Sequence, residues 1–302
     1  MTTQRSLIVE AGATPALEAF RSLPGDLATR DAQDLMAYPF FALGKSKRVT
    51  PIRFQTREIS LTVEGTHEHG IATIWDADVL IWAASQIVEA RDQGIPTSRL
   101  MLTTPYEILR FVGRGTGSHD YGRLKAALDR LQSTTIATSI RQLASRRLHR
   151  FSWINEWKEQ SDLAGRPRGI SLILPDWFYS GLLDSSLILT LDPIYFSLTG
   201  GIERWLYRLV RKHAGRQPDG WRFEFSHLHA KSGSAMRASD FARHVRRIAL
   251  AQSLPGYELH VEHRRSGDTL RFRIARRAPL EQSIRLLAQR LSSVPRSSGD
   301  KL

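Results

Sequence analysis

The chain has 302 residues, of which 41% are hydrophobic and 24% charged, and this globular composition and length suggest two domains. It contains no cysteine, which excludes disulfides, thiolate zinc sites and cysteine nucleophiles, and it has no apolar run near the roughly 18 residues of a membrane helix. Lysine and arginine number 43 against 30 acidic residues, so the net charge of +13 indicates a polyanionic partner, first of all nucleic acid; a solvated basic surface is the alternative.

The N-terminal segment is expected to be a flexible arm. Residues 1–38 mix Ala, Thr, Gly and Asp without a sustained period, and we expect at most one short helix around 14–22. Order is expected to begin at YPFFALGKSKR. From Val49 to Ile74 apolar and polar residues alternate, which predicts two or three strands with a turn at 64–70.

Three helices are predicted next. WDADVLIWAASQIVEARDQG begins with Asp76 as an N-cap candidate, and TTPYEILRFVGRG begins with a capping box of Thr104 and Glu107 around Pro105. SHDYGRLKAALDRLQS, capped by Ser118 or Asp120, has two faces. One face carries Tyr121, Leu124, Leu128 and Leu131, and the other carries Arg123, Ala126 and Arg130.

A hairpin is predicted after this basic helix. TTIATSI and RLHRFSWINEW alternate like its two arms, with RQLASRR between them, and RGISLIL is expected to be a third strand. Helix, helix, basic helix and hairpin is the order of a winged helix, in which the third helix enters the major groove and the hairpin, or wing, follows the backbone or minor groove. A helix fits there because the groove is about 12 Å wide.

The same order recurs in the second half. GGIERWLYRLVRKHAG predicts a helix that Gly215 ends, WRFEF a strand, and SHLHAKSG a short helix capped by Ser226. SDFARHVRRIALAQ then places Phe241, Val245 and Ile248 on one face and three arginines on the other, and YELHVEH and DTLRFRI form a hairpin around RRSGD. Two amphipathic helices in an ordinary α+β fold remain the alternative.

We therefore predict an α+β fold with two tandem winged-helix domains. The expected boundaries are 1–38 for the arm, 39–165 and 166–280 for the two domains, and 281–302 for a C-terminal helix and tail. Some of the candidate DNA-binding residues would contact phosphate and others would read guanine. They are Arg123, Lys125 and Arg130 on the first basic helix, Arg141, Arg146 and Arg147 in its wing, Arg243, Arg246 and Arg247 on the second helix, and Arg264 and Arg265 at the second hairpin tip.

Three other motifs resemble known catalytic or metal-binding patterns. His227 and His229 resemble the metal-holding His pair of nicking initiators, with Tyr257 as the nearest nucleophile, but a surface or core-edge pair is the better interpretation. HEH at 67–69 sits beside glycines in a turn and lacks further ligands at zinc-like spacing. GRGTGS at 113–118 lacks the Lys-Ser/Thr pair and preceding strand of a P-loop. No enzyme activity, metal or cofactor is expected.

A longer pattern carries a family resemblance. YPFFALGKSKRVTPIRF and the residues that follow to 87 are similar to the start of the plasmid replication initiator family called replication initiator protein A, and the similarity continues through MLTTPYEILRFVGRGTGSHDYGRLKAALDRLQSTTIATSI and LILPDWFYSGLL, to about 275. The resemblance implies two winged-helix domains that bind repeated sites, called iterons, in double-stranded origin DNA. It further implies origin opening, recruitment of a host replication initiator and the replicative helicase, and possible homodimers that repress their own promoter.

The sequence is compatible with three functions. The leading hypothesis is an origin-binding initiator that acts without catalysis, located in the cytoplasm and independent of membranes. A metal-dependent nicking initiator using His227, His229 and Tyr257, and a winged-helix transcription regulator, are the alternatives.

Overall fold

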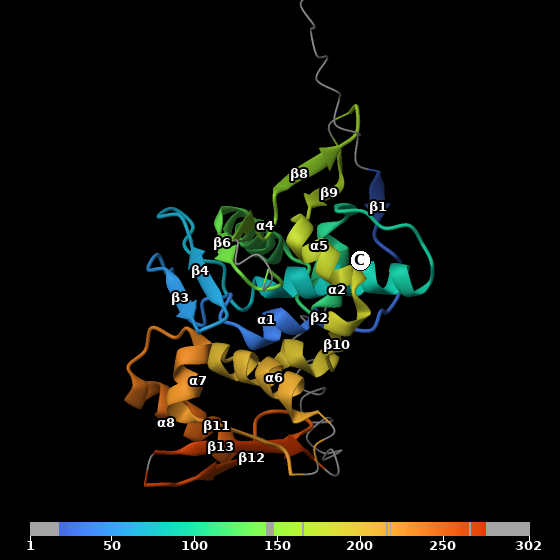
Figure 1. Cartoon of the computed structure of the whole chain (residues 1–302). Coiled ribbons are helices and arrows are strands. Elements are labelled where there is room, and N and C mark those ends of the chain that lie inside the picture. The colour runs from blue at the N-terminus through green and yellow to red at the C-terminus, as the bar shows by residue number, and fades with distance from the viewer. Residues whose placement is uncertain are drawn as a thin grey trace, which may run out of the picture.

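The computed structural model describes residues 18–142, 148–164, 166–215, 217, 219–265 and 267–275, and its chain forms two halves, one above the other in Figure 1. Each half has its own core of buried apolar side chains, with Trp82 and Trp153 in the first and Tyr207 and Phe241 in the second. None of the helices within these ranges is both long and apolar enough to span a membrane.

The first half is built around three helices and a sheet. The helices are α2 (Ala77–Asp92), α3 (Pro105–Phe111) and α4 (Ser118–Ser133). The sheet has the order β1-β5-β9-β8, formed by Ala19–Arg21, Leu100–Thr103, Pro167–Ile173 and Glu156–Ser161. Strand β5 is parallel to β1 and antiparallel to β9.

A second sheet packs on this half, with the order β3-β4-β6-β7. Its strands are Ile52–Gln55, Ser60–Glu64, Thr135–Thr138 and His149–Ser152. The alternation of residues 49–74 thus gives two strands and a turn at 66–70 as predicted, but the turn that joins β3 to β4 lies at 56–59; β6 pairs with β7 as the sequence suggested.

The second half repeats the plan of the first. Helix α6 (Gly201–Ala214) leads to β11 (Trp221–Glu224), α7 (Phe225–Ser232) and α8 (Ala238–Ala251), and the hairpin of β12 (Tyr257–Glu262) and β13 (Thr269–Ile274) follows. The sheet order is β11-β13-β12. Gly215 ends α6 as expected, whereas α7 begins after Glu224 rather than at a Ser226 cap.

Comparison of the two halves identifies the wings. The series α2-β5-α3-α4-β8-β9 matches α6-β11-α7-α8-β12-β13, and the sheet order β5-β9-β8 matches β11-β13-β12. The fold is therefore the predicted α+β pair of winged helices, but the first wing is β8–β9 and not the predicted β6–β7 pair, which belongs to the other sheet. The predicted boundary at 165 also falls inside this β8–β9 hairpin.

The prediction of a flexible N-terminal arm is wrong for residues 18–38, the part of the arm that the structure describes, because this part contains two strands and a helix. Strand β2 (Arg30–Ala32) pairs with β10 (Ile188–Thr190), and helix α1 (Gln33–Ala37) follows at once. Phe20 and Leu35 are buried in the first core. Burial removes their apolar side chains from water, which favours an ordered segment here. The remaining elements are α5 (Asp176–Leu183) and two 3₁₀ turns, η1 (Ser185–Leu187) and η2 (Pro193–Ser197). The predicted C-terminal helix lies outside the described residues.

The two halves meet along α6, which lies directly under α1 in Figure 1. Met36 of α1 and Ile81 of α2 belong to the core cluster of the second half. Two buried ion pairs also cross this contact between the two halves, here called the seam: Arg204 with Asp78, at 3.1 Å, and Arg208 with Asp31, at 2.7 Å. Apolar packing and buried charge pairs therefore set how the two winged helices sit relative to each other.

Candidate nucleic-acid interface

Helix α4 follows the predicted division into an apolar and a basic face. Leu124, Ala127, Leu128 and Leu131 are buried, and the helix begins after Gly117 rather than at a capping Ser118. On the other face, the side chain of Arg123 is 66% exposed and lies 3.9 Å from Asp120. Lys125 is also exposed and pairs with Glu159 of β8, which places the wing alongside this helix.

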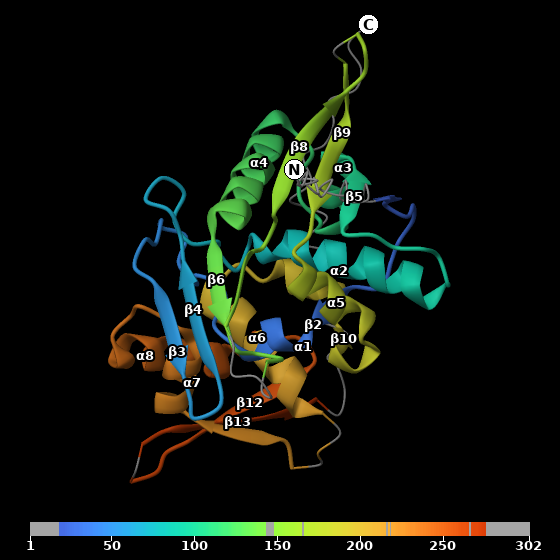
Figure 2. The same cartoon turned by 45° about the horizontal axis from the view of Figure 1, so that its top comes forward.

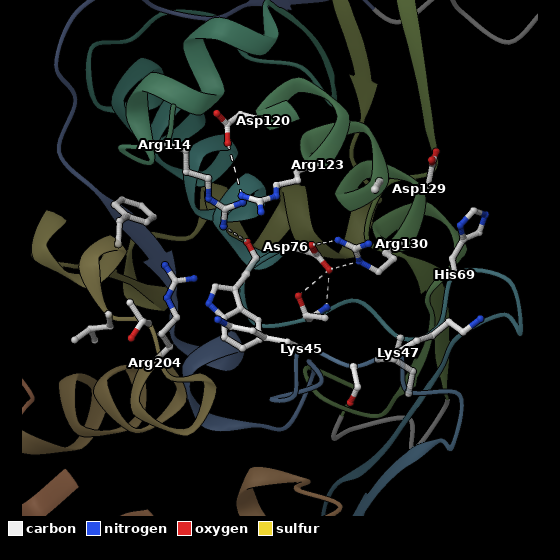
Figure 3. Close-up of a pocket in the computed structure, with 18 of the residues that line it drawn as sticks. Lys45, Lys47, His69, Asp76, Arg114, Asp120, Arg123, Asp129, Arg130 and Arg204 are labelled. Carbon is white, nitrogen blue, oxygen red and sulfur yellow. Dashed lines mark hydrogen bonds and ion pairs between the residues drawn. The ribbon is translucent and has the colours of Figure 1, made fainter. Parts of the chain in front are cut away.

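Arg130 lies on the same helical side as Arg123 but has a different environment. Its guanidinium donates two hydrogen bonds, of 2.8 and 2.7 Å, to the carboxylate of Asp76, which is itself buried (Figure 3). These hydrogen bonds raise the pKa of Arg130 above its usual value. Asp76 occupies the N-cap position of α2 as predicted, but its side chain accepts from the Thr73 amide and makes no capping hydrogen bond to the helix. Arg130 therefore fastens α4 to the start of α2 and is poorly placed to contact DNA.

Arg141, which was predicted to lie in the first wing, is not at a wing tip. Arg141 donates a 2.7 Å hydrogen bond to Asp34, another to the carbonyl of Trp177, and stacks 4.1 Å from the Trp177 ring. This arginine thus joins segments of the first core. Arg146 and Arg147 lie outside the described residues.

The β8–β9 wing carries cations that the sequence analysis missed. It projects beyond α4 in Figure 2, and the side chains of Lys158 and Arg168 are about two-thirds exposed, at 66% and 67%. At its tip the carboxylate of Asp162 accepts hydrogen bonds from the Ala164 and Arg166 amides, and from the Arg168 guanidinium. The second half of the sequence could have indicated this wing. There the wing is the β12–β13 hairpin, which pairs with β11, the strand before α7 and α8.

Helix α8 presents all three predicted arginines. Phe241, Val245, Ile248 and Ala249 are buried, and the opposite face is polar. Arg243 pairs with Asp240 within the helix, and its side chain is 76% exposed. Arg247 is exposed and contacts the Nδ1 atom of His244 at 2.9 Å. Arg246 reaches Asp268 at 2.6 Å, so it braces the helix against the hairpin that follows.

The second wing also carries exposed cations. Arg264 pairs with Glu262 at 2.8 Å, and Arg265 is exposed in the adjoining turn. Hydrogen bonds from Arg264 and Arg222 lower the pKa of Glu262, and those from His263 and Arg246 lower the pKa of Asp268. Glu262 and Asp268 are therefore ionised and offset part of the basic charge of this wing, while Arg265 is exposed at its tip.

The comparisons with known proteins agree with this architecture. The family model described as "Replication initiator protein A" matches residues 30–259, most of the chain. This chain belongs to the replication initiator protein A family. It is 28% identical over 229 residues to a putative replication protein of Wigglesworthia glossinidia brevipalpis, an alignment that covers 74% of this chain and 82% of that protein. The family resemblance read from the sequence is thus confirmed.

Two crystal structures of RctB domains 2 and 3 share the fold of this replication initiator. A selenomethionine derivative superposes with a TM-score of 0.57 at 14% identity, covering 80% of this chain and 98% of the other. A second RctB structure gives 0.52 at 15% identity, covering 83% and 99%. At such identities the likeness shows the arrangement of elements and no residue roles.

The histidine pair of this initiator lies on a helix, not a strand. His227 stacks on Phe223, and the Nε2 atom of His229 lies 2.9 Å from the carbonyl of Met236. Burial raises the pKa of Tyr257 to about 12, and its ring packs 5.6 Å from Tyr207. Among the described residues there is no group of three His, Cys, Asp or Glu side chains that could hold a metal ion. This geometry gives no support to a nucleophilic role for Tyr257.

Proposed function

We propose that this replication initiator binds repeated sites in double-stranded plasmid origin DNA, with α4 and α8 in successive major grooves and the β8–β9 and β12–β13 wings on the flanking backbone. Binding of several copies bends the DNA and promotes local opening. The contacts of each bound copy offset the free energy of its bend, which is roughly 1–6 kcal/mol by elastic estimates. The bound chain then recruits a host replication initiator and the replicative helicase. The protein acts without catalysis, and a homodimer represses its own promoter.

One observation carries the proposal: two basic helices, each backed by an apolar face and each with a wing hairpin further along the chain, belong to units joined by apolar packing and two buried ion pairs. Duplex DNA offers successive major grooves about one helical turn apart, which suits two reading helices in a fixed relation. Exposed arginines on both helices supply the bidentate donors that recognise guanine.

The proposed DNA contacts fall into three groups. Arg123, Arg243 and Arg247 are proposed to reach base edges or phosphates from the helices. Lys158 and Arg168 of the first wing, and Arg264 and Arg265 of the second, are proposed to contact the backbone. Lys125 and Arg246 contribute while bracing their helices, whereas Arg130 and Arg141 are assigned structural roles.

A binding titration tests the base-reading helix. The double variant Arg243→Ala/Arg247→Ala is expected to weaken binding to a duplex from the origin region by roughly 1–3 kcal/mol for each arginine that reads a base. The control Arg243→Lys/Arg247→Lys keeps both charges but loses the planar fork, so it should retain affinity for random duplex and lose the preference for origin DNA. Equal affinity of all three proteins for both duplexes would contradict the assignment.

A transformation experiment tests the replication role. A plasmid whose only origin is the fragment bound by this protein should be established in cells that express the protein, and lost from cells that do not. Replication without the protein would support the alternative of a transcription regulator with the same fold.

A further inference from the structure

The segment Leu43–Arg48, here called the bridge segment, runs between the two winged helices. At its start Ala42 exchanges backbone hydrogen bonds of 2.9 Å with Ala72 and Ile74. At its end the Arg48 carbonyl accepts a 2.7 Å hydrogen bond from the Ile71 amide. Both ends are thus tied to the 71–74 stretch, which leads directly to Asp76 and so to the Arg130 clamp on α4.

The bridge segment is also fixed to the second domain. The Arg48 guanidinium donates a 2.6 Å hydrogen bond to the carbonyl of Gly233, the left-handed residue in the turn between α7 and α8. At Gly201, the first residue of α6, a Cβ atom would lie 1.9 Å from the Leu43 carbonyl oxygen, so only glycine allows this approach. One short segment therefore contacts the supports of both α4 and α8.

Two lysines project from this fixed backbone. Lys45 and Lys47 are exposed, and Figure 3 shows them across the cleft from Arg123 and Arg130. The Lys45 ammonium lies 5.6 Å from the Trp75 ring centre, and that of Lys47 lies 3.4 Å from a backbone carbonyl. Within the described ranges neither ammonium pairs with a carboxylate, whereas Arg114 and Arg204 in the same cleft both pair with the carboxylate of Asp78.

The cleft lies beside α4 and extends to Thr199, two residues before α6. It has a volume of about 1070 Å³ and is lined by Arg123 of α4, both lysines and Thr199. A neighbouring cavity of about 390 Å³ shares Thr199 and is lined by Leu43 and by Arg247 of α8. The bridge segment thus lies on the route from one basic helix to the other.

We infer that Lys45 and Lys47 form a phosphate-binding bridge that holds the DNA backbone between the two major-groove tracts. This inference rests on the proposed function, because it concerns the stretch of duplex that passes from α4 to α8. Lysine suits this role because its ammonium is a compact charge that attracts phosphate without the fork geometry that reads guanine. Such contacts fix position on the duplex and carry no sequence information.

Salt dependence of binding tests the bridge. For the wild type and the variant Lys45→Ala/Lys47→Ala, affinity is measured against potassium chloride on an origin duplex and on a random duplex of equal length. Loss of two phosphate contacts should reduce the log–log slope by about 1.8, at about 0.9 for each contact, and should lower affinity by the same factor on both duplexes. Hydroxyl-radical footprints should lose protection only between the two major-groove tracts.

The matched control removes the same charge elsewhere. Arg53→Ala/Arg57→Ala changes two exposed bases outside the bridge segment, Arg53 on β3 opposite Thr62 and Arg57 in the β3–β4 turn, and should leave slope and footprint unchanged. A Lys45/Lys47 variant with the slope of this control, or with a loss confined to the origin duplex, would overturn the inference. Wild-type protein that binds neither duplex would instead refute the proposed function.

Discussion

Substitution of Asp78 should disrupt the seam between the two domains. Its carboxylate is almost fully buried and accepts hydrogen bonds from Arg204, at 3.1 and 3.2 Å, and from Arg114, at 2.8 Å. In Asp78→Asn the shape is kept but the Arg204 guanidinium, which is 1% exposed, loses its counter-charge. Breaking one partner of a buried pair typically costs about 3–5 kcal/mol, because the remaining charge is still desolvated.

The loss is large against the stability of a typical protein, about 5–15 kcal/mol. Because the partly exposed Arg114 can turn to solvent, we assign the cost to Arg204 and expect about 3 kcal/mol. Urea unfolding followed by tryptophan fluorescence and by circular dichroism measures it, with the midpoint lowered and the slope unchanged. The control is Asp92→Asn, whose carboxylate pairs with Arg91 at 2.7 Å on the surface and should contribute no more than about 1 kcal/mol.

A second variant separates buried charge from a general packing defect. Replacing both partners in Asp78→Leu/Arg204→Leu removes the unpaired guanidinium and should recover most of the stability that Asp78→Asn loses. The reasoning would be refuted if Asp78→Asn were no less stable than Asp92→Asn, or if the double variant were less stable than the single one.

Three further changes test other parts of the fold. Burial opposes the charge of Glu107, but hydrogen bonds from two threonines and a serine outweigh it and lower its pKa. That stabilisation is present above the ordinary pKa and lost as pH falls through the folded value, so Glu107→Gln should lose about 1 kcal/mol at pH 7 in urea titrations, and this difference from the wild type should shrink as the pH falls through the lowered pKa. Burial and a neighbouring lysine lower the pKa of Lys231 to about 8, so its charge opposes folding below that pH. Lys231→Met should therefore stabilise the chain by about 1 kcal/mol at pH 7, and the gain should vanish as pH rises from 8 towards the unfolded value; a gain that persists at high pH would exclude this cause. Gly201→Ala would drive a methyl group into the Leu43 carbonyl and should cost at least about 1–3 kcal/mol, whereas Gly122→Ala, in open space on α4, should gain up to about 1 kcal/mol; equal melting temperatures would contradict both.

The sequence predicted helices α4 and α8 well because their signal is local. The leucines of α4 and the apolar residues of α8 recur at helical spacing, and the structure buries them as expected. The capping box of Thr104 and Glu107 is also confirmed, since both of its hydrogen bonds lie within one turn. Patterns of this kind depend on neighbours along the chain, which the sequence displays directly.

The prediction of the first wing was wrong because the pairing of strands depends on residues far apart in the chain. Alternation marks Thr135–Thr138 as a strand but does not say which strand lies beside it. In the structure β6 lies between β4 and β7, where its β-branched residues fit a strand paired on both sides. The true wing strand, β8, reads as a polar segment because four of its six residues, from Lys158 to Ser161, are exposed.

Arg123 and Arg130 show the same limit at single residues. Seven positions apart, they occupy nearly the same side of α4, so helical spacing cannot separate them. The structure does separate them, because Asp76 lies within reach of only the second, 54 residues earlier in the chain. Whether an arginine is a structural clamp or a free contact is decided by such distant partners.

The two buried ion pairs fix how the halves are oriented at the seam, although burying their charges has a large desolvation penalty. Buried pairs seldom add net stability over apolar side chains of the same volume, and apolar contacts such as those of Met36 and Ile81 already join the two halves. Apolar surfaces alone, however, tolerate small slides and rotations, whereas a buried guanidinium displaced from its carboxylate is penalised at once. Arg204 and Arg208 stand one turn apart on α6 and face acids from two different elements, so only one docking satisfies both pairs. Under the proposed mode of binding, the distance between the two reading helices is therefore a property of the protein, and the spacing of contacts in the DNA site must conform to it.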